Sequence, residues 1–146
     1  MKKLLVVLVT GLALTLVAVA VAAQTYKVKA TLTPGADVPK PSGAAGAKGS
    51  FVGSYVENKS GAVLKATLSF SGLTGPAMQA HIHTGKPGVS GNVIVPLCGP
   101  CTSGKTATYK ISKAVVKALE SGKTYVNVHT AKNPAGEIRG QIKVTG

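Results

Sequence analysis

The feature of this sequence that most constrains its fold is a regular alternation of apolar and polar residues in short stretches. Between residues 26 and 33, apolar residues occupy every even position and lysine or threonine every odd position. Successive side chains of a β-strand point to opposite faces, so this pattern indicates a strand with one buried and one solvated face. Residues 64–70 show the same alternation. The pattern therefore predicts a protein built from half-buried strands.

Glycine and proline separate these stretches, with 18 and 8 copies respectively, and both residue types favour turns. About eight short strands are expected, at residues 26–33, 49–57, 64–70, 79–84, 92–97, 106–111, 124–129 and 137–144. In the last of them, even-numbered and odd-numbered residues should face opposite sides of the sheet. Many short strands joined by turns are typical of a β-sandwich. We predict an all-β fold, a Greek-key antiparallel β-sandwich or a flattened barrel.

One short helix is expected between the strands at 106–111 and 124–129. Ser112 can cap a helix over residues 113–120 by accepting a backbone N–H, and Gly122 can end it. The apolar residues that would pack it against the sheet are Val115, Val116 and Leu119.

The N-terminal segment has the pattern of a secretory signal. Two lysines precede an apolar run over residues 4–21, and alanines end the segment before Gln24. This order of charge, apolar run and small residues is the one that signal peptidases recognise. We predict a signal peptide over residues 1–23 and a single exported domain over residues 24–146, secreted or periplasmic. Because the apolar run is long for a cleaved signal, an uncleaved membrane anchor is the alternative.

The chain is strongly basic, with 17 Lys and Arg against 4 Asp and Glu and a formal net charge of +13. Arg139 is the only arginine and aromatic residues make up 4% of the chain. The arginine forks and stacking aromatics of nucleic-acid-binding proteins are therefore missing, and no nucleic-acid partner is expected. The lysines, spread from Lys27 to Lys143, either form a solvated surface or attract an anionic cell-surface polymer or lipid.

The three histidines of the chain fall in two of the predicted strands. His81 and His83 are two residues apart, so both imidazoles should project from one face while Ile82 points to the other. If the strand of His129 lies beside theirs, three imidazoles converge, a set that suits copper or zinc. Glu137 is the candidate for a fourth ligand or for a group that orients the imidazoles. Alternatively, the histidines only hold loops in place through hydrogen bonds.

Three polar residues near these histidines are candidates for outer partners of the site: Asn127, Glu137 and Arg139. Glu137 and Arg139 should share one strand face, where they would form a local ion pair or clamp the turn over residues 133–136. Binding of a small anion by this pair is a further alternative.

Cys98, Gly99, Pro100 and Cys101 repeat the four letters of the thioredoxin redox motif. That motif needs a following helix, whose dipole lowers the pKa of the first thiol, and here the next residues are turn-forming. In an oxidising compartment the expected state is a disulfide that staples a loop. Thiol–disulfide exchange is the alternative.

Two segments resemble the CHRD (chordin) domain family, namely AHIHTG at residues 80–85 and YVNVHTAKNPAGEIRGQI at residues 125–142. The similarity extends through residues 36–39, 72–73 and 91–93, and so covers nearly the whole predicted domain. The family occurs in extracellular chordin and in many exported bacterial proteins, most of them single domains without an assigned activity. The resemblance therefore implies a fold and an extracellular location, but no particular activity.

A weaker local similarity links the histidines to copper/zinc superoxide dismutase. A His-x-His strand followed by a later Val-His is similar to that family's copper-binding pattern, which implies copper ligands at His81, His83 and His129. Arg139 would correspond to the active-site arginine. With only three histidines and one aspartate, Asp37, the chain has no zinc ligands or bridging histidine.

Together these observations predict an exported, non-catalytic binding or structural module. The sharper hypothesis for this module is that it binds one copper or zinc ion through His81, His83 and His129. The alternatives are a superoxide dismutase-like copper redox enzyme, or a thiol–disulfide protein that uses Cys98 and Cys101.

Overall fold

The computed structural model describes residues 23–146, so the predicted signal peptide, apart from its last residue, lies outside the described part. In chain order the elements are β1 (Thr25–Leu32), η1 (Pro34–Ala36), β2 (Lys48–Asn58), β3 (Gly61–Ser71), β4 (Ala77–Thr84), β5 (Val93–Cys98), β6 (Lys105–Ser112), α1 (Lys113–Glu120), β7 (Thr124–Thr130), β8 (Ile138–Gln141) and β9 (Lys143–Thr145). In residues 23–146, no helix has the length and apolar character that crossing a membrane requires.

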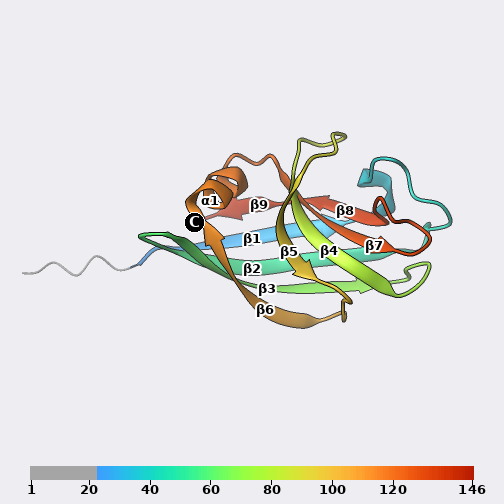
Figure 1. Cartoon of the computed structure of the whole chain (residues 1–146), viewed down its shortest axis with the longest axis horizontal. Coiled ribbons are helices and arrows are strands. Elements are labelled where there is room, and N and C mark those ends of the chain that lie inside the picture. The colour runs from blue at the N-terminus through green and yellow to red at the C-terminus, as the bar shows by residue number, and fades with distance from the viewer. Residues whose placement is uncertain (1–22) are drawn as a thin grey trace, which may run out of the picture.

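The strands form two antiparallel sheets. Sheet A has the order β6-β3-β2-β1-β9 and sheet B the order β5-β4-β7-β8. Figure 1 shows β4 and β5 crossing over the strands of sheet A at an angle, as expected for two twisted sheets packed face to face. The prediction of an antiparallel β-sandwich is confirmed.

The core lies between the inner faces of the two sheets. In β1 the even-numbered residues Val28, Ala30 and Leu32 are at most 2% exposed, whereas the odd-numbered lysines and threonines face solvent. Sheet B contributes Ile82, Val126 and Val128 from its own inner face, each 0% exposed. The alternation in the sequence therefore identifies the buried face of each strand, as the hydrophobic effect requires.

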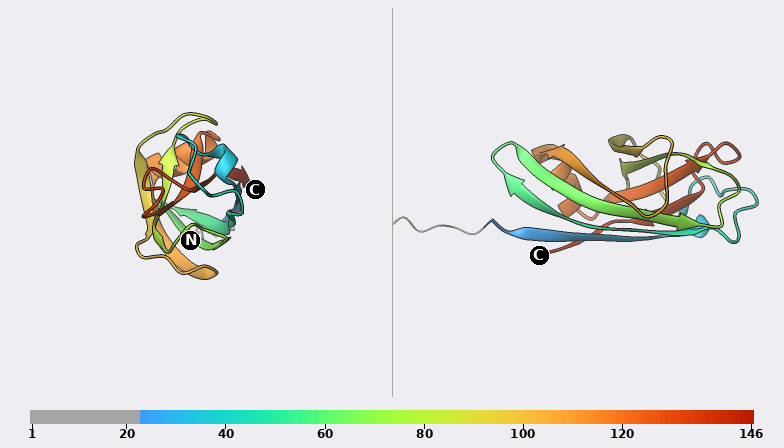
Figure 2. Two further views of the ribbon diagram at one scale, coloured as in Figure 1. Left: turned by 90° about the vertical axis from the view of Figure 1, so that its right-hand side faces the viewer. Right: turned by 90° about the horizontal axis from the view of Figure 1, so that it is seen from below.

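The helix α1 closes one end of the sandwich, near the β2–β3 hairpin (Figure 2). It spans Lys113–Glu120 as predicted, and the Ser112 hydroxyl accepts from the Val115 amide at 3.4 Å. Val116 and Leu119 are buried, and Gly122 adopts the left-handed conformation that ends the helix, with φ of 68°.

The prediction of one strand over residues 137–144 is wrong. The chain changes sheets at Ile142: β8 pairs with β7 in sheet B, and β9 pairs with β1 in sheet A. The expected solvated face is also absent in β8, because loops cover its outer side and leave Arg139 only 1% exposed. This change of sheet links the two layers at one edge of the sandwich.

Gly53 offers a test of the close packing inside sheet A. It pairs with Ala66 in the centre of the β2–β3 ladder, and an added methyl group would meet the Lys65 carbonyl oxygen and lie 2.6 Å from Ala66 Cβ. We expect Gly53→Ala to lower the free energy of unfolding by about 1–3 kcal/mol, because the two backbones would have to separate. Urea-induced unfolding followed by circular dichroism measures this loss.

Gly35→Ala is the matched control, since a methyl group at Gly35 would meet nothing within 4 Å. It should change the free energy of unfolding by less than about 1 kcal/mol. Equal losses in the two variants would contradict the close approach at Gly53.

Candidate metal centre

The three histidines converge on the outer face of sheet B. β4 and β7 are antiparallel neighbours, with His81 opposite Asn127 and Gln79 opposite His129. Because Ile82 points into the core, His81 and His83 project from the opposite face. His81 Nδ1 lies 3.3 Å from His129 Nε2, and one ring nitrogen from each histidine lies within 4.8 Å of the other two. The predicted convergence is confirmed.

Backbone carbonyls orient two of the rings. His83 Nδ1 lies 2.9 Å from the Gly91 oxygen and His129 Nδ1 lies 3.1 Å from the Pro134 oxygen. A carbonyl oxygen can only accept, so both Nδ1 atoms carry the proton. In the neutral rings this leaves the Nε2 lone pairs of His83 and His129 as acceptors, and that of His83 has no hydrogen-bond partner. His81 Nδ1 then donates to His129 Nε2, and in the other neutral tautomer, with the proton on Nε2, the Nδ1 lone pair of His81 could bind a metal ion instead.

The environment favours neutral, metal-binding imidazoles. Burial lowers the pKa of His129 to about 4, although the hydrogen bond to Pro134 works in the opposite direction. Burial, followed by the nearby charge of His83, lowers the pKa of His81. His83 is 8% exposed and its Nε2 has no hydrogen-bond partner. The lowered pKa values keep His81 and His129 in the neutral form that metal ligation requires at neutral pH.

The spacing of the ring nitrogens fits ligation of a single ion. Nitrogens bound to one zinc or copper ion at about 2.0–2.1 Å lie roughly 3–3.5 Å apart. The pair formed by His81 and His129 is already at 3.3 Å, and the remaining separations of at most 4.8 Å close with a shift of about 1 Å or slightly more. Small rotations of the side chains supply such a shift.

A stack of three side chains supports His83. The Tyr125 ring lies parallel to the His83 imidazole, with centroids 4.9 Å apart and an interplanar angle of 8°. The Arg139 guanidinium carbon lies 3.4 Å from the centroid of the same tyrosine ring, a cation–π contact. Because β7 lies between β4 and β8, Tyr125 is held between His83 and Arg139.

The same two supporting residues hold the loop over residues 85–92. Arg139 Nη2 donates to the carbonyls of Lys86 and Val89 at 2.9 Å each. The Gly91 amide donates to the Tyr125 hydroxyl at 3.2 Å. The loop is thus fixed at three points that precede the Gly91 carbonyl, and the imidazole of His83 is held through that carbonyl.

Glu137 is not among the imidazoles. It is 0% exposed, and its carboxylate accepts from the Thr74 amide at 2.6 Å, from Asn133 Nδ2 at 3.0 Å and from the Thr130 hydroxyl. These hydrogen bonds lower its pKa despite its burial. The expected ion pair with Arg139 is wrong, because the two groups bind different partners. The alternative is right: Glu137 clamps the turn over residues 133–136.

Asn127 and Arg139 do not contact the histidines through hydrogen bonds but bind neighbouring groups. Asn127 Nδ2 donates to Asp37 Oδ1 at 3.2 Å, deep under the loop that carries η1. Asp37 is 1% exposed, and burial raises its pKa. Arg139 is equally buried. These positions argue against the alternative that Glu137 and Arg139 bind a small anion, since the Arg139 guanidinium is covered by the residue 85–92 loop.

Sequence reasoning missed three contributors to the site: Tyr125 and the carbonyls of Gly91 and Pro134. Tyr125 has the same parity as His129 in one strand, and this signal already indicated its presence on the outer face. The two carbonyls belong to loops, whose backbone direction no side-chain pattern reveals.

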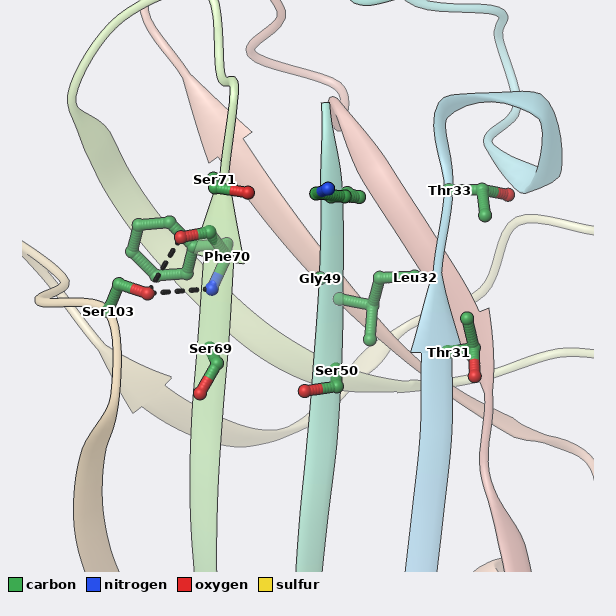
Figure 3. Close-up of a pocket in the computed structure, with 10 residues that line it drawn as sticks. Thr31, Leu32, Thr33, Gly49, Ser50, Ser69, Phe70, Ser71 and Ser103 are labelled. Atoms are coloured by element: carbon green, nitrogen blue, oxygen red, sulfur yellow. Dashed lines mark hydrogen bonds between the residues drawn. The ribbon is translucent and has the colours of Figure 1, made fainter. Parts of the chain in front are cut away.

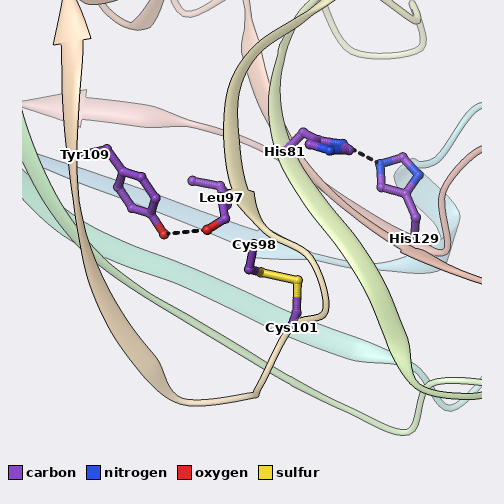
Figure 4. Close-up of a disulfide and its surroundings, with 6 residues drawn as sticks. All are labelled: His81, Leu97, Cys98, Cys101, Tyr109 and His129. Carbon is purple, nitrogen blue, oxygen red and sulfur yellow. Dashed lines mark hydrogen bonds between the residues drawn. A yellow bond between two sulfur atoms is a disulfide. The ribbon is translucent and has the colours of Figure 1, made fainter.

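Cys98 and Cys101 form the predicted disulfide at the end of β5, with an S–S distance of 2.08 Å (Figure 4). The residues after Cys101 form a turn that leads into β6, so the helix that would activate a thioredoxin thiol is missing here. A shallow hollow of about 330 Å³ lies between this loop and His81, lined also by Gln79 and Pro96.

Comparison with known proteins agrees with this architecture. Neither the curated proteins nor the solved structures contained a significant match to this chain. A family model matches residues 28–142, from the first strand of sheet A to the change of sheet after β8, and its description is the CHRD domain. The chain therefore belongs to the CHRD domain family.

Proposed function

We propose that this CHRD domain is an exported, non-catalytic module that binds one copper or zinc ion through His81, His83 and His129. The observation that carries the proposal is the buried Nε2 atom of His83. It has no hydrogen-bond partner, and one nitrogen of the same ring lies within 4.8 Å of a ring nitrogen of both His81 and His129.

The competing explanation is that the histidines only hold loops in place. The hydrogen bonds to Gly91 and Pro134 fit that explanation, but they also fit a metal centre, because metal-bound imidazoles commonly donate their second N–H to a carbonyl. A purely structural role leaves the Nε2 of His83 buried and unpaired, which costs about 1–3 kcal/mol. A metal ion bound to this nitrogen would remove the cost and would account for both sets of contacts.

Copper is favoured over zinc at equilibrium. Neutral imidazoles suit both ions, and a given nitrogen site generally binds Cu(II) more tightly than Zn(II). The carboxylate of Glu137 is occupied by Thr74, Thr130 and Asn133. A fourth ligand would therefore be water or a small molecule, entering from the hollow beside His81.

Export is supported by two observations on different parts of the chain. The N-terminal sequence has the order of charge, apolar run and small residues that a signal peptide requires. The disulfide between Cys98 and Cys101 is of a kind that persists in oxidising compartments. An extracytoplasmic metal-binding module is consistent with both.

We expect the purified protein to bind one equivalent of Cu(II) at neutral pH. His81→Ala and His83→Ala should each weaken binding by about 100-fold or more, because each removes one of three ligands. Isothermal titration against a competing chelator measures the affinity, and electron paramagnetic resonance of the copper detects the coordinated nitrogens. Cu(II) should also displace bound Zn(II).

Gln79→Ala is the matched control for this experiment, since Gln79 lies on β4 opposite His129 but contributes no imidazole. It should leave the affinity within about threefold of that of the wild type. Affinity no tighter than millimolar, or full retention of binding in both histidine variants, would contradict the proposal. A superoxide assay on the copper-loaded protein separates a binding module from a redox enzyme.

We expect the metal-free protein to lose stability as the pH falls from about 6.5 towards about 4. In the folded protein the pKa of His129 is lowered to about 4, whereas the unfolded chain keeps the ordinary value of 6.5. Between these values the unfolded state binds more protons, so stability falls with falling pH. Urea unfolding at about pH 7 and about pH 5 measures the loss.

His129→Gln removes this titration and should lose clearly less stability over the same interval. If the variant and the wild type lose equal amounts of stability, the His129 imidazole is not the cause.

A further inference from the structure

The outer face of sheet A has an unusual composition. Apart from Asn58 and Gly61 at the β2–β3 hairpin, its outward positions, which follow from the strand registers, are occupied by lysine, threonine, serine and valine. We call this surface the lysine–hydroxyl face; its residues are Thr25, Lys27, Lys29, Thr31, Lys48, Ser50, Val52, Ser54, Val56, Val63, Lys65, Thr67, Ser69, Ser71, Thr106, Thr108, Lys110, Ser112, Lys143 and Thr145.

This face carries positive charge without any compensating acid. Of the four acidic residues in the chain, Asp37 and Glu137 are buried beneath the loops of sheet B. Glu57 lies at the end of β2, next to the hairpin, and Glu120 ends α1 and accepts from the Tyr55 hydroxyl. None of the four belongs to the outward rows of sheet A. The face therefore presents a field of one sign.

Protection of sheet edges does not explain this arrangement. Lysines commonly protect edge strands from pairing with other chains, but Lys27, Lys29 and Lys65 lie on the interior strands β1 and β3. Lys29 also stands directly opposite Lys143 of β9. Like charges opposite each other destabilise a sheet, so this pair costs stability in the isolated protein. A bound polyanion would offset that repulsion.

Hydroxyl groups lie between the lysines in regular rows. Thr31, Ser50 and Ser69 are cross-strand neighbours, so they form one row across β1, β2 and β3. Neighbouring strands lie about 4.8 Å apart and successive outward residues about 6.8 Å apart along a strand. The lysines and hydroxyls are thus spaced on the scale of a single sugar unit.

A hollow of about 400 Å³ lies at one end of this face (Figure 3). The row of Thr31, Ser50 and Ser69 lines it, together with Lys48 and Ser71. Gly49 also lines the hollow, on the strand between those that carry Thr31 and Ser69. The hollow combines one cation with several hydroxyl groups, which suits a carboxylate-bearing sugar.

We propose that the lysine–hydroxyl face binds an acidic polysaccharide. The lysine ammonium groups would pair with the carboxylates, and the threonine and serine hydroxyls would exchange hydrogen bonds with the sugar hydroxyls. This function is independent of the metal centre, because the two sites lie on opposite outer faces of the sandwich.

The chemistry of the face favours a polysaccharide over two other polyanions. Insertion into a membrane interface uses tryptophan, phenylalanine or leucine, and the only apolar residues here are Val52, Val56 and Val63. Binding of nucleic acids uses arginine forks and stacking aromatics, and the face has neither. Lysines with hydroxyls leave the sugar as the best match.

Binding to polygalacturonate, with neutral dextran as the reference polymer, tests this proposal. A triple variant, Lys27→Gln with Lys29→Gln and Lys65→Gln, should bind polygalacturonate about tenfold or more weakly than the wild type. The dependence of its affinity on salt should also be shallower, because fewer ion contacts remain. Biolayer interferometry over a series of salt concentrations measures both quantities.

The matched control removes three exposed lysines away from the face, Lys86→Gln with Lys123→Gln and Lys132→Gln, and so changes the net charge equally. It should bind within about threefold of the wild type. Equal losses in the two triple variants would reveal non-specific attraction and overturn the proposal. So would the absence of binding at low salt, or tighter binding to phosphatidylglycerol vesicles or DNA than to polygalacturonate. Urea unfolding checks that both variants are folded.

Discussion

The interaction on which both the fold and the candidate site depend is the burial of Arg139. Its main chain pairs with Thr33, with N···O distances of 3.0 and 3.1 Å, and so joins β8 to the end of β1. Its guanidinium lies on the Tyr125 ring and donates to two carbonyls of the residue 85–92 loop. A buried cation needs such partners to offset its desolvation. Because two carbonyls of the residue 85–92 loop are such partners, the loop lies where its Gly91 carbonyl orients His83.

Much of the fold could be predicted because the hydrophobic effect acts on single residues and leaves a local pattern. The even-numbered positions of β1 and the capped helix after Ser112 were readable in this way. The change of sheet at Ile142 was not, because apolar residues continue at the same period through residues 138–144 and only the partners change. Strand pairing is set by contacts between distant segments, and alternation alone does not specify them.

The positions of the three histidines could also be predicted from local pattern, but the contacts around them could not. Alternation placed His81 and His83 on one face, and antiparallel pairing of β4 with β7 added His129. The role of Glu137 could not be predicted, since its partner Thr74 is 63 residues away in the chain and lies in the β3–β4 connection. A carboxylate near histidines in sequence suggests a ligand. In this fold the same carboxylate is used to hold the turn that orients His129.

The arrangement of charge reconciles a strongly basic protein with a cation site. A concentration of lysines beside the histidines would repel an approaching metal ion. The lysine–hydroxyl face is instead on the outer side of sheet A, and two packed sheets about 10 Å apart separate it from the imidazoles. Charges separated by more than about 8 Å are largely screened at physiological ionic strength when solvent reaches them. The protein can therefore hold a polyanion on one face while neutral imidazoles on the other remain open to a metal ion.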